Sequence, residues 1–394
     1  MLRATRLAFR GPADMRRAMT DRPPSATDVL IVGAGIAGAS LAAALAPWRR
    51  VVLVEAEDIP GYHATGRSAA FWHETYGGAA VQPLTLASLG TLRNPDPAFS
   101  DRAFLSPRSA LTIGRTSEAA AVDAFVAEFR AKGVDVERMS GAAVASRVPG
   151  LRSEWSEAAY EAACRDIDVG GLHAAYLRAA KRAGALLATR APLRSARRVR
   201  DGWRVALGEE EVDAAVIVNA AGAWADTVAA ACGIAPLGIQ PYRRTVLQVR
   251  LDVAVPAELP LVIHVGGQFY FKGESVGRVW LSPHDETPSI AHDVAPEDWD
   301  VATAIERMQS VVDWPVAAVE RKWAGLRSFA PDRIPVFGPD PHEGRFIWCA
   351  GQGGFGIQTA PAIAGLLAAQ LGAPPPPGAI GRVDPLPFAP ARFT

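Results

Sequence analysis

The chain has 394 residues, of which 49% are hydrophobic and 21% are charged. At about 150 residues per domain, this length predicts two domains and excludes a peptide or a small disulfide scaffold. The 41 Lys and Arg residues balance the 41 Asp and Glu residues, so no overall field would hold the protein on nucleic acid or an anionic membrane. Because the three cysteines, Cys164, Cys232 and Cys349, form no CxxC pair, we expect neither disulfides nor a bound metal.

Residues 1–27 contain six arginines and no apolar run long enough for a secretory signal. We interpret this stretch as a disordered arm or as the result of a mis-assigned start, with Met19 as a second start site. We expect a cytoplasmic protein, either free or peripheral at the inner membrane.

Residues 29–48 carry no charge and are numerous enough to cross a bilayer. Glycines nevertheless divide this run into a short strand (29–32), a tight turn and a helix that begins at Ile36. A second buried strand, 51–54, follows and ends at Glu55. We therefore expect no transmembrane segment. The order strand, Gly-x-Gly-x-x-Gly turn, helix, strand and acid is the context in which this turn binds a dinucleotide.

Each residue of the turn has a physical task. Gly33 permits the sharp exit from the strand, Gly35 lets the backbone approach a pyrophosphate, and Gly38 allows the helix to pack closely on the sheet. The helix N-terminus faces the phosphates with free N–H groups and the positive end of its dipole. The Glu55 carboxylate can accept hydrogen bonds from both hydroxyls of an adenosine ribose. The neighbouring positions expected at the cofactor are Ile36, Ala37 and Ala56.

Three later segments indicate which dinucleotide binds. Residues 60–70, PGYHATGRSAA, resemble the flavin-contacting segment of the D-amino-acid oxidase superfamily of FAD enzymes, which includes glycine and sarcosine oxidases. Residues 216–224, VIVNAAGAW, resemble the second FAD strand and turn of that family. Residues 346–358, FIWCAGQGGFGIQ, resemble its last strand, glycine loop and flavin-facing helix, although a tight strand-to-helix turn alone would look alike.

The resemblance implies non-covalent FAD, because this chain has no cysteine near Gly325, where some relatives attach the flavin. The glycine loop would aim free N–H groups at the pyrimidine edge of the flavin and stabilise its negative charge on reduction. The residues implied to contact FAD are Thr65, Gly66, Arg67, Ser68, Ala69, Ala221, Gly222, Trp224, Gly353, Gly354, Phe355, Gly356 and Ile357.

The implied fold is α/β: a Rossmann-like FAD-binding domain with an inserted antiparallel-sheet substrate domain of α+β type. Aromatic and β-branched runs at 246–249, 269–271 and 279–281 predict the inserted sheet, and helices are expected near 118–132 and 296–312. The expected FAD-binding segments are 28–100, 159–236 and 320–373, the substrate segments are 101–158 and 237–319, and a Pro-rich tail, packed or loose, is 374–394.

Five segments in order, GYHATGRSAA, NAAGAWAD, LGIQPYRR, KWAGLRSF and GQGGFGIQT, most resemble bacterial D-arginine dehydrogenases. A buried substrate carboxylate needs a cationic, preferably bidentate partner, and Arg supplies one better than Lys. Arg327 lies among apolar neighbours and is the expected partner. The resemblance adds Arg244 and Tyr270 on the carboxylate side, and Tyr76, whose hydroxyl shields the substrate. Core packing of the tyrosines and a surface ion pair for Arg244 are the alternatives.

The sequence departs from these relatives beside the reacting centre. Phe71 stands where they have histidine, and His73 stands where they have threonine. His73 either takes over an acid–base role, since imidazole titrates near neutrality, or is structural. Asp101 aligns with the carboxylate that selects a cationic side chain, unless Arg102 neutralises it at the surface.

The resemblance implies oxidative deamination of a D-amino acid, with a basic one such as D-arginine or D-lysine as an option. Hydride would pass from Cα to flavin N5, and the imino acid would hydrolyse to a 2-keto acid and ammonia. Trp280 aligns with the lysine that activates dioxygen in sarcosine-type oxidases, so a dehydrogenase is favoured. The expected acceptor is a quinone or dioxygen, and the role of Lys272 stays open. The alternatives are a glycine, sarcosine or 2-hydroxy-acid oxidoreductase, and an FAD-dependent tRNA-modification protein, which the neutral net charge disfavours.

Overall fold

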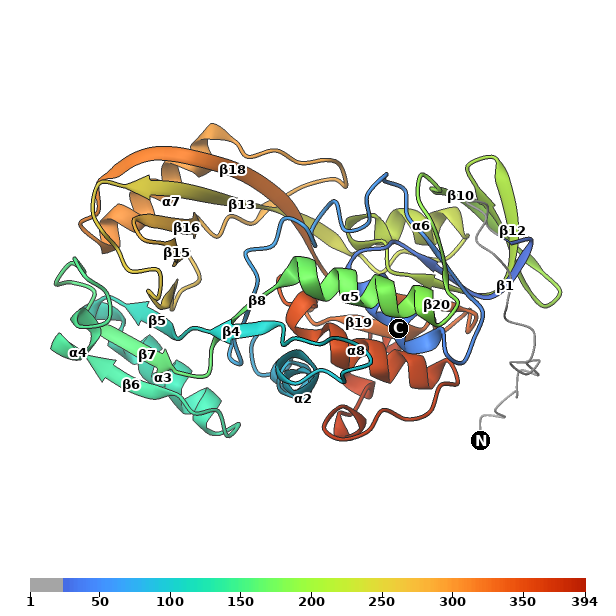
Figure 1. Cartoon of the computed structure of the whole chain (residues 1–394), viewed down its shortest axis with the longest axis horizontal. Coiled ribbons are helices and arrows are strands. Elements are labelled where there is room, and N and C mark those ends of the chain that lie inside the picture. Colours follow the sequence, from blue (N-terminus) through green and yellow to red (C-terminus); the bar gives the residue numbers. More distant parts are fainter. Residues whose placement is uncertain (1–23) are drawn as a thin grey trace.

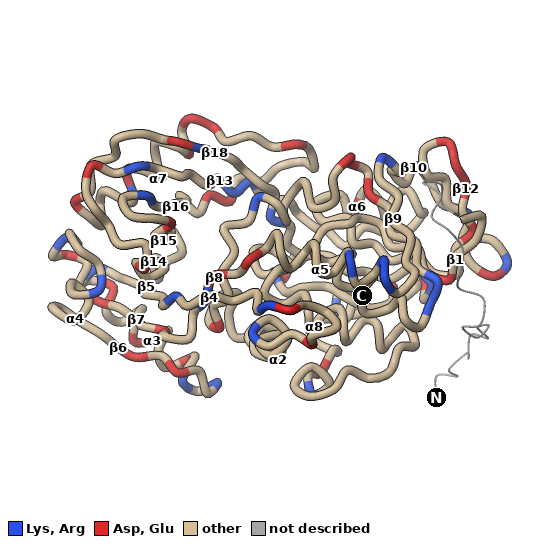
Figure 2. Tube along the Cα trace, viewed as in Figure 1, with Lys and Arg blue, Asp and Glu red and all other residues tan. Residues whose placement is uncertain are grey.

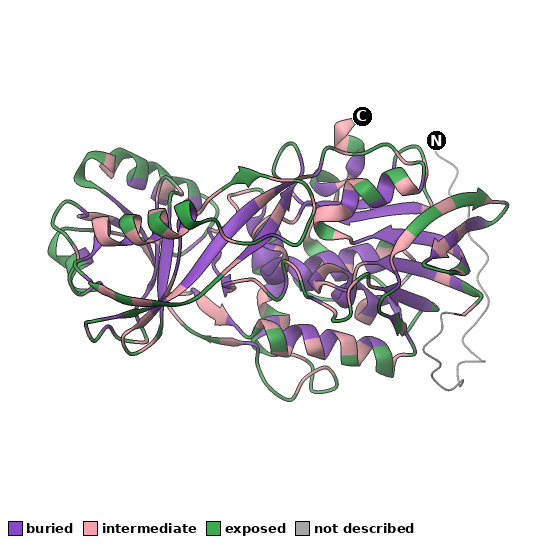
Figure 3. Cartoon of the chain, turned by 90° about the horizontal axis from the view of Figure 1, so that it is seen from above, coloured by how far each residue is buried: buried purple, intermediate pink, exposed green. Residues whose placement is uncertain are grey.

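A computed structural model describes residues 24–394 and shows two lobes, each built on one large sheet (Figure 1). Positive and negative side chains are interspersed over both lobes (Figure 2). Seen from above, the strands of both sheets are mostly buried, whereas the outer faces of the helices are exposed (Figure 3). Apolar clusters lie on both faces of the first sheet, and a separate cluster fills the second lobe.

The first sheet, on the right of Figure 1, contains the dinucleotide motif. Its order is β10 (Leu193–Val199), β11 (Gly202–Leu207), β12 (Glu210–Asn219), β1 (Ala26–Val32), β2 (Val51–Val54) and β9 (Leu186–Ala188), with β20 (Phe346–Ala350) beside β12 and β19 (Val336–Pro339) beside β20. The strands β9, β2, β1, β12 and β20 are parallel neighbours. Their carboxyl ends consequently meet at one edge.

Helices cover both faces of this sheet because side chains on β1 alternate in direction. Val29 and Ile31 pack with α1 (Ile36–Leu45) and α8 (Gly356–Gln370). Leu30 and Val32 pack with α6 (Ala225–Ala231) on the opposite face. The two further helices of this lobe are α2 (Gln82–Arg93), which contacts α8, and α5 (Val169–Arg182), which contacts α1.

The second sheet forms the other lobe. Its order is β17 (Thr287–Pro288), β13 (Gln240–Leu251), β16 (Arg278–Ser282), β15 (Tyr270–Ser275), β14 (Leu261–His264), β5 (Ala110–Gly114), β7 (Glu157–Glu161) and β6 (Glu137–Ser140), with β18 (Val316–Phe329) on the other side of β13. All pairs are antiparallel except β5 with β14. Its helices are α3 (Ala119–Arg130), α4 (Ala142–Ala145) and α7 (Asp298–Val311).

A small sheet of three strands lies between the lobes: β3 (Phe71–Trp72), β8 (Arg165–Ile167) and β4 (Leu105–Pro107). The expected inserted lobe is therefore present, but its edges differ from the expected segments. β18 pairs with β13 along its whole length, so the beginning of segment 320–373 belongs to the substrate sheet. β7 likewise crosses the expected boundary at residue 158. Long strands that run from one lobe to the other cannot be divided by a change of composition.

The two ends differ as well. β1 already begins at Ala26, within the expected arm, and the rest of that arm up to residue 23 lies outside the described residues. The tail is packed: it forms three short 3-10 turns, Ile380–Arg382, Leu386–Phe388 and Pro390–Phe393, and the Phe388 ring stacks on Phe337 at 5.1 Å. Over residues 24–394, no helix is both long and apolar enough to cross a membrane, since run 29–48 is divided between β1 and α1.

Candidate active site

A cavity of about 440 Å³ opens at the carboxyl ends of β1, β2 and β12 and extends to β18. Most of the expected cofactor contacts line it, from the turn after β1 to the glycine loop before α8. They are Gly33, Gly35, Ile36, Ala37, Glu55, Ala56, Thr65, Arg67, Ser68, Ala221, Gly222, Trp224, Gly353, Gly354, Gly356 and Ile357. The motifs, far apart in sequence, thus share one wall.

Four of the expected contacts lie behind this wall instead. A Cβ on Gly38 would meet the Gly33 carbonyl oxygen at 1.9 Å, and one on Gly66 would meet the Gly61 carbonyl oxygen at 2.8 Å. Ala69 is buried in an apolar cluster, and the Phe355 ring packs against Tyr76 and Phe329. These residues shape the loops whose neighbours line the cavity.

The turn after β1 leaves room for a pyrophosphate. Gly33 has φ of +100°, and a Cβ there would lie 2.5 Å from the carbonyl oxygen of Ala220. Gly35 is bare toward the cavity, and a Cβ there would lie 3.2 Å from Thr65 Oγ1, which itself accepts a hydrogen bond from the Ile36 N–H at 2.9 Å. A glycine turn without projecting side chains, at a helix N-terminus, lets the backbone N–H groups approach a phosphate.

The Glu55 carboxylate lines the ribose end of the cavity. Its two oxygens accept hydrogen bonds from the backbone N–H groups of Ala34 at 2.9 Å and of Glu57 at 3.1 Å. These bonds fix the carboxylate and leave further lone pairs for a pair of hydroxyls. The residues present therefore fit a dinucleotide. The glycines leave space for its phosphates, and the Glu55 carboxylate can accept hydrogen bonds from its ribose.

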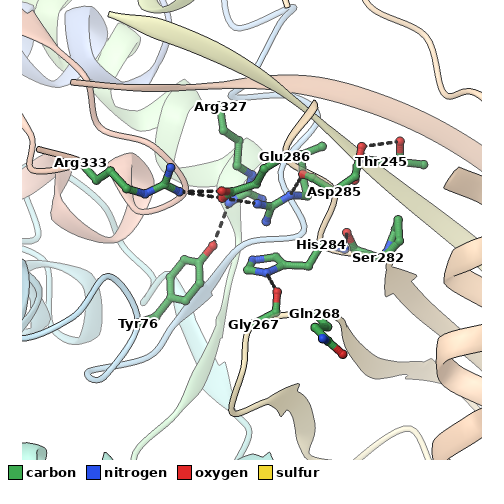
Figure 4. Close-up of polar contacts among 12 residues, drawn as sticks. Tyr76, Thr245, Gly267, Gln268, Ser282, His284, Asp285, Glu286, Arg327 and Arg333 are labelled. Atoms are coloured by element: carbon green, nitrogen blue, oxygen red, sulfur yellow. Dashed lines mark hydrogen bonds and ion pairs between the residues drawn. The ribbon is translucent and has the colours of Figure 1, made fainter. Parts of the chain in front are cut away.

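Arg327, on β18, also lines the cavity, at the end away from Glu55. Figure 4 shows its side chain beside the Tyr76 hydroxyl. Its Nη1 donates a hydrogen bond to the Tyr76 hydroxyl at 3.0 Å. Among the described residues it forms no ion pair with a carboxylate. A Cβ on Gly354 would lie 2.1 Å from this Nη1 and 2.4 Å from the Tyr76 hydroxyl. The cofactor loop and the cationic group are therefore in direct contact.

Arg244, on β13, is the second cation of this end and lines the same cavity. Its Nε donates to the Asp285 carbonyl oxygen at 2.8 Å, and its Nη2 donates to Glu286 Oε1 at 3.0 Å. Its Nη1 is buried without a partner in residues 24–394. Burial, and then repulsion from Arg327, lower the pKa of Arg244. Two buried guanidinium groups share this end, and only Arg244 has a carboxylate partner.

Aromatic side chains close the wall beside Arg327. Tyr270 is buried, burial raises the pKa of its phenol, and its ring lies edge-on to Phe71 at 6.0 Å. Phe71 also contacts Tyr76 at 5.1 Å. A further space of about 10 Å³, room for one water, lies between Phe71, Arg327 and Gly354. In this structure the wall leaves little space for a long side chain.

Four expected substrate residues are not among those that line the cavity. Tyr76 and Tyr270 pack beside Arg327 and Phe71, whereas His73 and Asp101 lie elsewhere. His73 is buried with its Nε2 3.0 Å from Glu161 Oε2 and 3.1 Å from Thr75 Oγ1. This pairing argues against an acid–base role for His73. Asp101 lies exposed in the loop between α2 and β4, and Arg102 lies 3.5 Å from Asp168. Asp101 was assigned from the resemblance, whereas His73 was proposed as a replacement at a position where the relatives have threonine.

Lys272 does not line the cavity either. Its Nζ donates a hydrogen bond to Asp166 at 2.7 Å and lies 5.3 Å from the Trp280 ring centre. None of the three cysteines lines the cavity, and all three are buried as free thiols. In the described part of the chain, no cluster of His, Cys, Asp and Glu could hold a metal ion.

Sequence reasoning missed two features of the site. His284, between β16 and β17, lies close to both arginines, and the loop 289–296 contributes His292 and Val294 to the cavity wall. Asp293 in that loop accepts hydrogen bonds from Tyr62 at 2.9 Å and from Arg67 at 2.5 Å. No motif marks these residues, because their partners are distant in sequence and, for Asp293, come from the other lobe.

The fold and this site define a FAD-dependent oxidoreductase of the D-amino-acid oxidase type. A family model described as "DAO: FAD dependent oxidoreductase" matches residues 28–370. The chain belongs to that family, and its cofactor is FAD.

Known relatives agree with this assignment. FAD-dependent oxidoreductase domain-containing protein 1 of Mus musculus is 26% identical over 86% of this chain and 80% of its own length. The match to its Bos taurus counterpart spans 35% of that protein. Glycine oxidase from Geobacillus kaustophilus superposes with a TM-score of 0.80 at 23% identity, covering 93% of this chain and 98% of that one. L-proline dehydrogenase from P. horikoshii gives 0.81 at 19% identity over 94% and 98%.

Proposed function

We propose that this protein oxidises a D-amino acid to an imino acid, which hydrolyses to a 2-keto acid and ammonia. Bound FAD supplies the acceptor for the hydride that leaves Cα. The observation that supports this most directly is Arg327, a guanidinium deep in the protein, open to the cavity and without a carboxylate partner among the described residues. Such a group needs an anion, and a substrate carboxylate provides it.

The side chains around Arg327 would orient the substrate. Tyr76 fixes the guanidinium through its hydroxyl at 3.0 Å. Arg244 adds a second cation at the cavity wall. The Tyr270 hydroxyl, buried beside Phe71 and without a hydrogen-bond partner in residues 24–394, would donate to the same carboxylate. The backbone of Gly353 and Gly354 would stabilise negative charge on the reduced flavin. We propose that FAD is held without a covalent bond, since no cysteine lines the cavity.

The surroundings of Arg327 favour a small or apolar side chain over a basic one. The only carboxylates that line the cavity in the described chain, Glu55 and Glu57, lie at its ribose end, and Asp101 is exposed elsewhere. Phe71 fills the space beside Arg327. The second candidate is a small amine such as glycine or sarcosine, which this narrow space and the similarity to a glycine oxidase fold favour.

A dehydrogenase is favoured over an oxidase. Lys272, the lysine nearest in sequence to the aligned position, is bonded to Asp166, and no lysine lines the cavity within residues 24–394. The proposed acceptor is a quinone, with dioxygen as the alternative.

The test is the anaerobic visible spectrum of the purified protein with D-amino acids, glycine, sarcosine and 2-hydroxy acids. We expect small apolar D-amino acids or small amines to bleach the flavin band, and D-arginine to bleach it more slowly. Arg327→Ala should keep its flavin and lose about 30-fold or more in kcat/KM, because a buried charge pair contributes about 2–5 kcal/mol. A panel in which no compound bleaches the flavin, or unchanged turnover in Arg327→Ala, would contradict the proposal.

A further inference from the structure

Residues 73–76 form the turn that brings Tyr76 to Arg327. The turn follows β3, and the Tyr76 N–H donates a hydrogen bond back to the His73 carbonyl oxygen at 3.1 Å. Figure 4 shows the Tyr76 hydroxyl directed at Arg327, which donates to it at 3.0 Å. The positions of this hydroxyl and of the guanidinium therefore depend on the contacts that hold the turn.

Glu161, the last residue of β7, holds the turn from the substrate lobe. Its Oε1 accepts a hydrogen bond from the Glu74 N–H at 2.9 Å, and its Oε2 lies 3.0 Å from His73 Nε2. Burial alone would raise the pKa of this carboxyl, but the His73 imidazole, the Glu74 N–H and the Thr75 hydroxyl lower it below its ordinary value. Three consecutive residues of the turn thus act on one carboxylate.

The pair of Glu161 and His73 lies in the protein interior. Both side chains are only 3% exposed, so water cannot replace either partner. Because an ionised carboxylate only accepts hydrogen bonds, His73 Nε2 carries a hydrogen on the side of Glu161. Breaking a buried pair by removing one partner leaves the other partner without compensation, which is costly. This contact is therefore a strong restraint on the turn.

The cofactor lobe holds both ends of the same turn. Gln358, on α8, accepts from the His73 N–H through Oε1 at 3.1 Å, and its Nε2 donates to the Tyr76 carbonyl oxygen at 3.1 Å. α8 directly follows the glycine loop that lines the cavity. The turn is thus bonded to a strand of the substrate sheet and to the helix beside the expected cofactor.

We propose that Glu161 and His73 are positioning residues for substrate binding, because they fix the turn that places the Tyr76 hydroxyl against Arg327. The role rests on the proposed function, in which Arg327 binds the substrate carboxylate. Glu161 and His73 are not among the residues that line the cavity, so they act through Tyr76 and not on the substrate. A threonine, which the similar D-arginine dehydrogenases have at position 73, could not form this ion pair.

The test is the effect of Glu161→Leu on substrate binding. The Glu74 N–H and the imidazole lose their acceptor, so the turn and the Tyr76 hydroxyl should shift. Arg327 would bind the carboxylate in the ground state and in the transition state alike, so the loss should appear in KM and not in kcat. With the best amine of the panel, we expect KM to rise about 10-fold, as for one hydrogen bond to a charged group, and kcat to stay within about threefold.

A binding measurement without turnover accompanies the kinetics. Acetate, a carboxylate that has no amine, is titrated into each holoenzyme and followed by the change in the visible spectrum of the flavin. Its affinity should fall in Glu161→Leu by about the factor by which KM rises. FAD content should stay normal, because the bonds of Gln358 to the turn remain.

Two further variants separate positioning from stability. Glu161→Gln keeps an oxygen that can accept from the Glu74 N–H, so it should retain a KM close to that of wild type. His73→Leu/Glu161→Leu also removes the imidazole that Glu161→Leu leaves buried without a partner. This double variant should fold even if the single variant does not, and its KM should be raised in the same way.

Glu118→Leu is the matched control. Glu118 also accepts from a backbone N–H, that of Arg115 at 2.7 Å, and lies 3.0 Å from a buried imidazole, His264 Nε2. This pair lies in the same lobe but away from the turn, so the variant should keep the wild-type KM.

Three results would count against these assignments. A wild-type KM and acetate affinity in the double variant would overturn the positioning role. An equal rise in KM in Glu118→Leu would also overturn it, since any loosening of the lobe would then have the same effect. A wild-type flavin that no amine reduces and whose spectrum acetate does not change would instead overturn the proposed function, and the positioning role with it.

Discussion

The two ends of the cavity are built from different materials. At the ribose and phosphate end, the wall is mainly backbone, from glycines and helix N-termini. Its one acid, Glu55, is itself fixed by the backbone N–H groups of Ala34 and Glu57. At the substrate end, the wall is side chains from β13, β15, β18 and two loops. A backbone site is specified locally, whereas a side-chain site requires the whole fold to be in place.

The largest effect should come from adding one carbon at the backbone end. In Gly33→Ala the new Cβ would lie 2.5 Å from the Ala220 carbonyl oxygen, and φ of +100° is strained for any other residue. Because β1 and β12 must separate there, we expect protein purified without flavin, with FAD affinity lowered about 100-fold or more, as for a clash beyond about 2.7 kcal/mol. FAD content after purification and titration with FAD measure this.

Gly133→Ala is the control, since Gly133 has φ of +79° but open space around it. This variant should retain FAD and lose only about 1 kcal/mol of stability. If Gly33→Ala also retained FAD, the backbone would not be the feature that holds the cofactor.

The next effect should appear where the two ends touch. Gly354→Ala would bring a Cβ to 2.1 Å from Arg327 Nη1 and 2.4 Å from the Tyr76 hydroxyl. Arg327 would have to move, and a displacement of about 1 Å costs about 10²-fold, so we expect kcat/KM to fall about 10²-fold. FAD affinity should fall less than in Gly33→Ala. Steady-state kinetics and FAD titration measure the two effects separately.

Gly344→Ala, at a glycine of ordinary φ with nothing within 4 Å, is the control and should behave as wild type. Were Gly354→Ala to lose FAD but keep the kcat/KM of its remaining holoenzyme, the loop would serve the cofactor alone.

This division explains how much the sequence could predict. β2 was predicted to the residue, because it is a short apolar run bounded by turns, whereas β20 was expected from the family resemblance of residues 346–358. The cofactor wall followed from three motifs for the same reason. Arg327 and Tyr76, in contrast, meet across 251 positions of sequence, and only the family resemblance suggested that they lie together.

The same reasoning explains the failures. Asp101 was aligned with the carboxylate that selects a cationic side chain, and it is exposed in its loop. His73 was considered because it stands where the relatives have threonine, and it lies beside Glu161. His284 belongs to no motif, and its place beside Tyr270 and the two arginines arises only when β13, β15 and β18 are assembled. Such properties are invisible until distant strands are assembled.

The smallest effect should come from a side-chain contact between the two lobes at the backbone end of the cavity. Asp293, from the substrate lobe, accepts from Tyr62 and Arg67, and Arg67 also donates to the Val294 carbonyl oxygen at 3.1 Å. These bonds hold loop 289–296 in place beside the cavity.

Asp293 is 55% exposed, so the contact is screened, and exposed pairs contribute about 0.2–1 kcal/mol. Asp293→Asn should therefore release FAD about two- to fivefold faster, measured by the fluorescence of FAD freed on dilution of the holoenzyme. Asp298→Asn, at the start of α7, removes an exposed pair with Lys322 on β18 and should leave the release rate unchanged. Equal release from both variants would mean that the cofactor is held by its own lobe without help from the other.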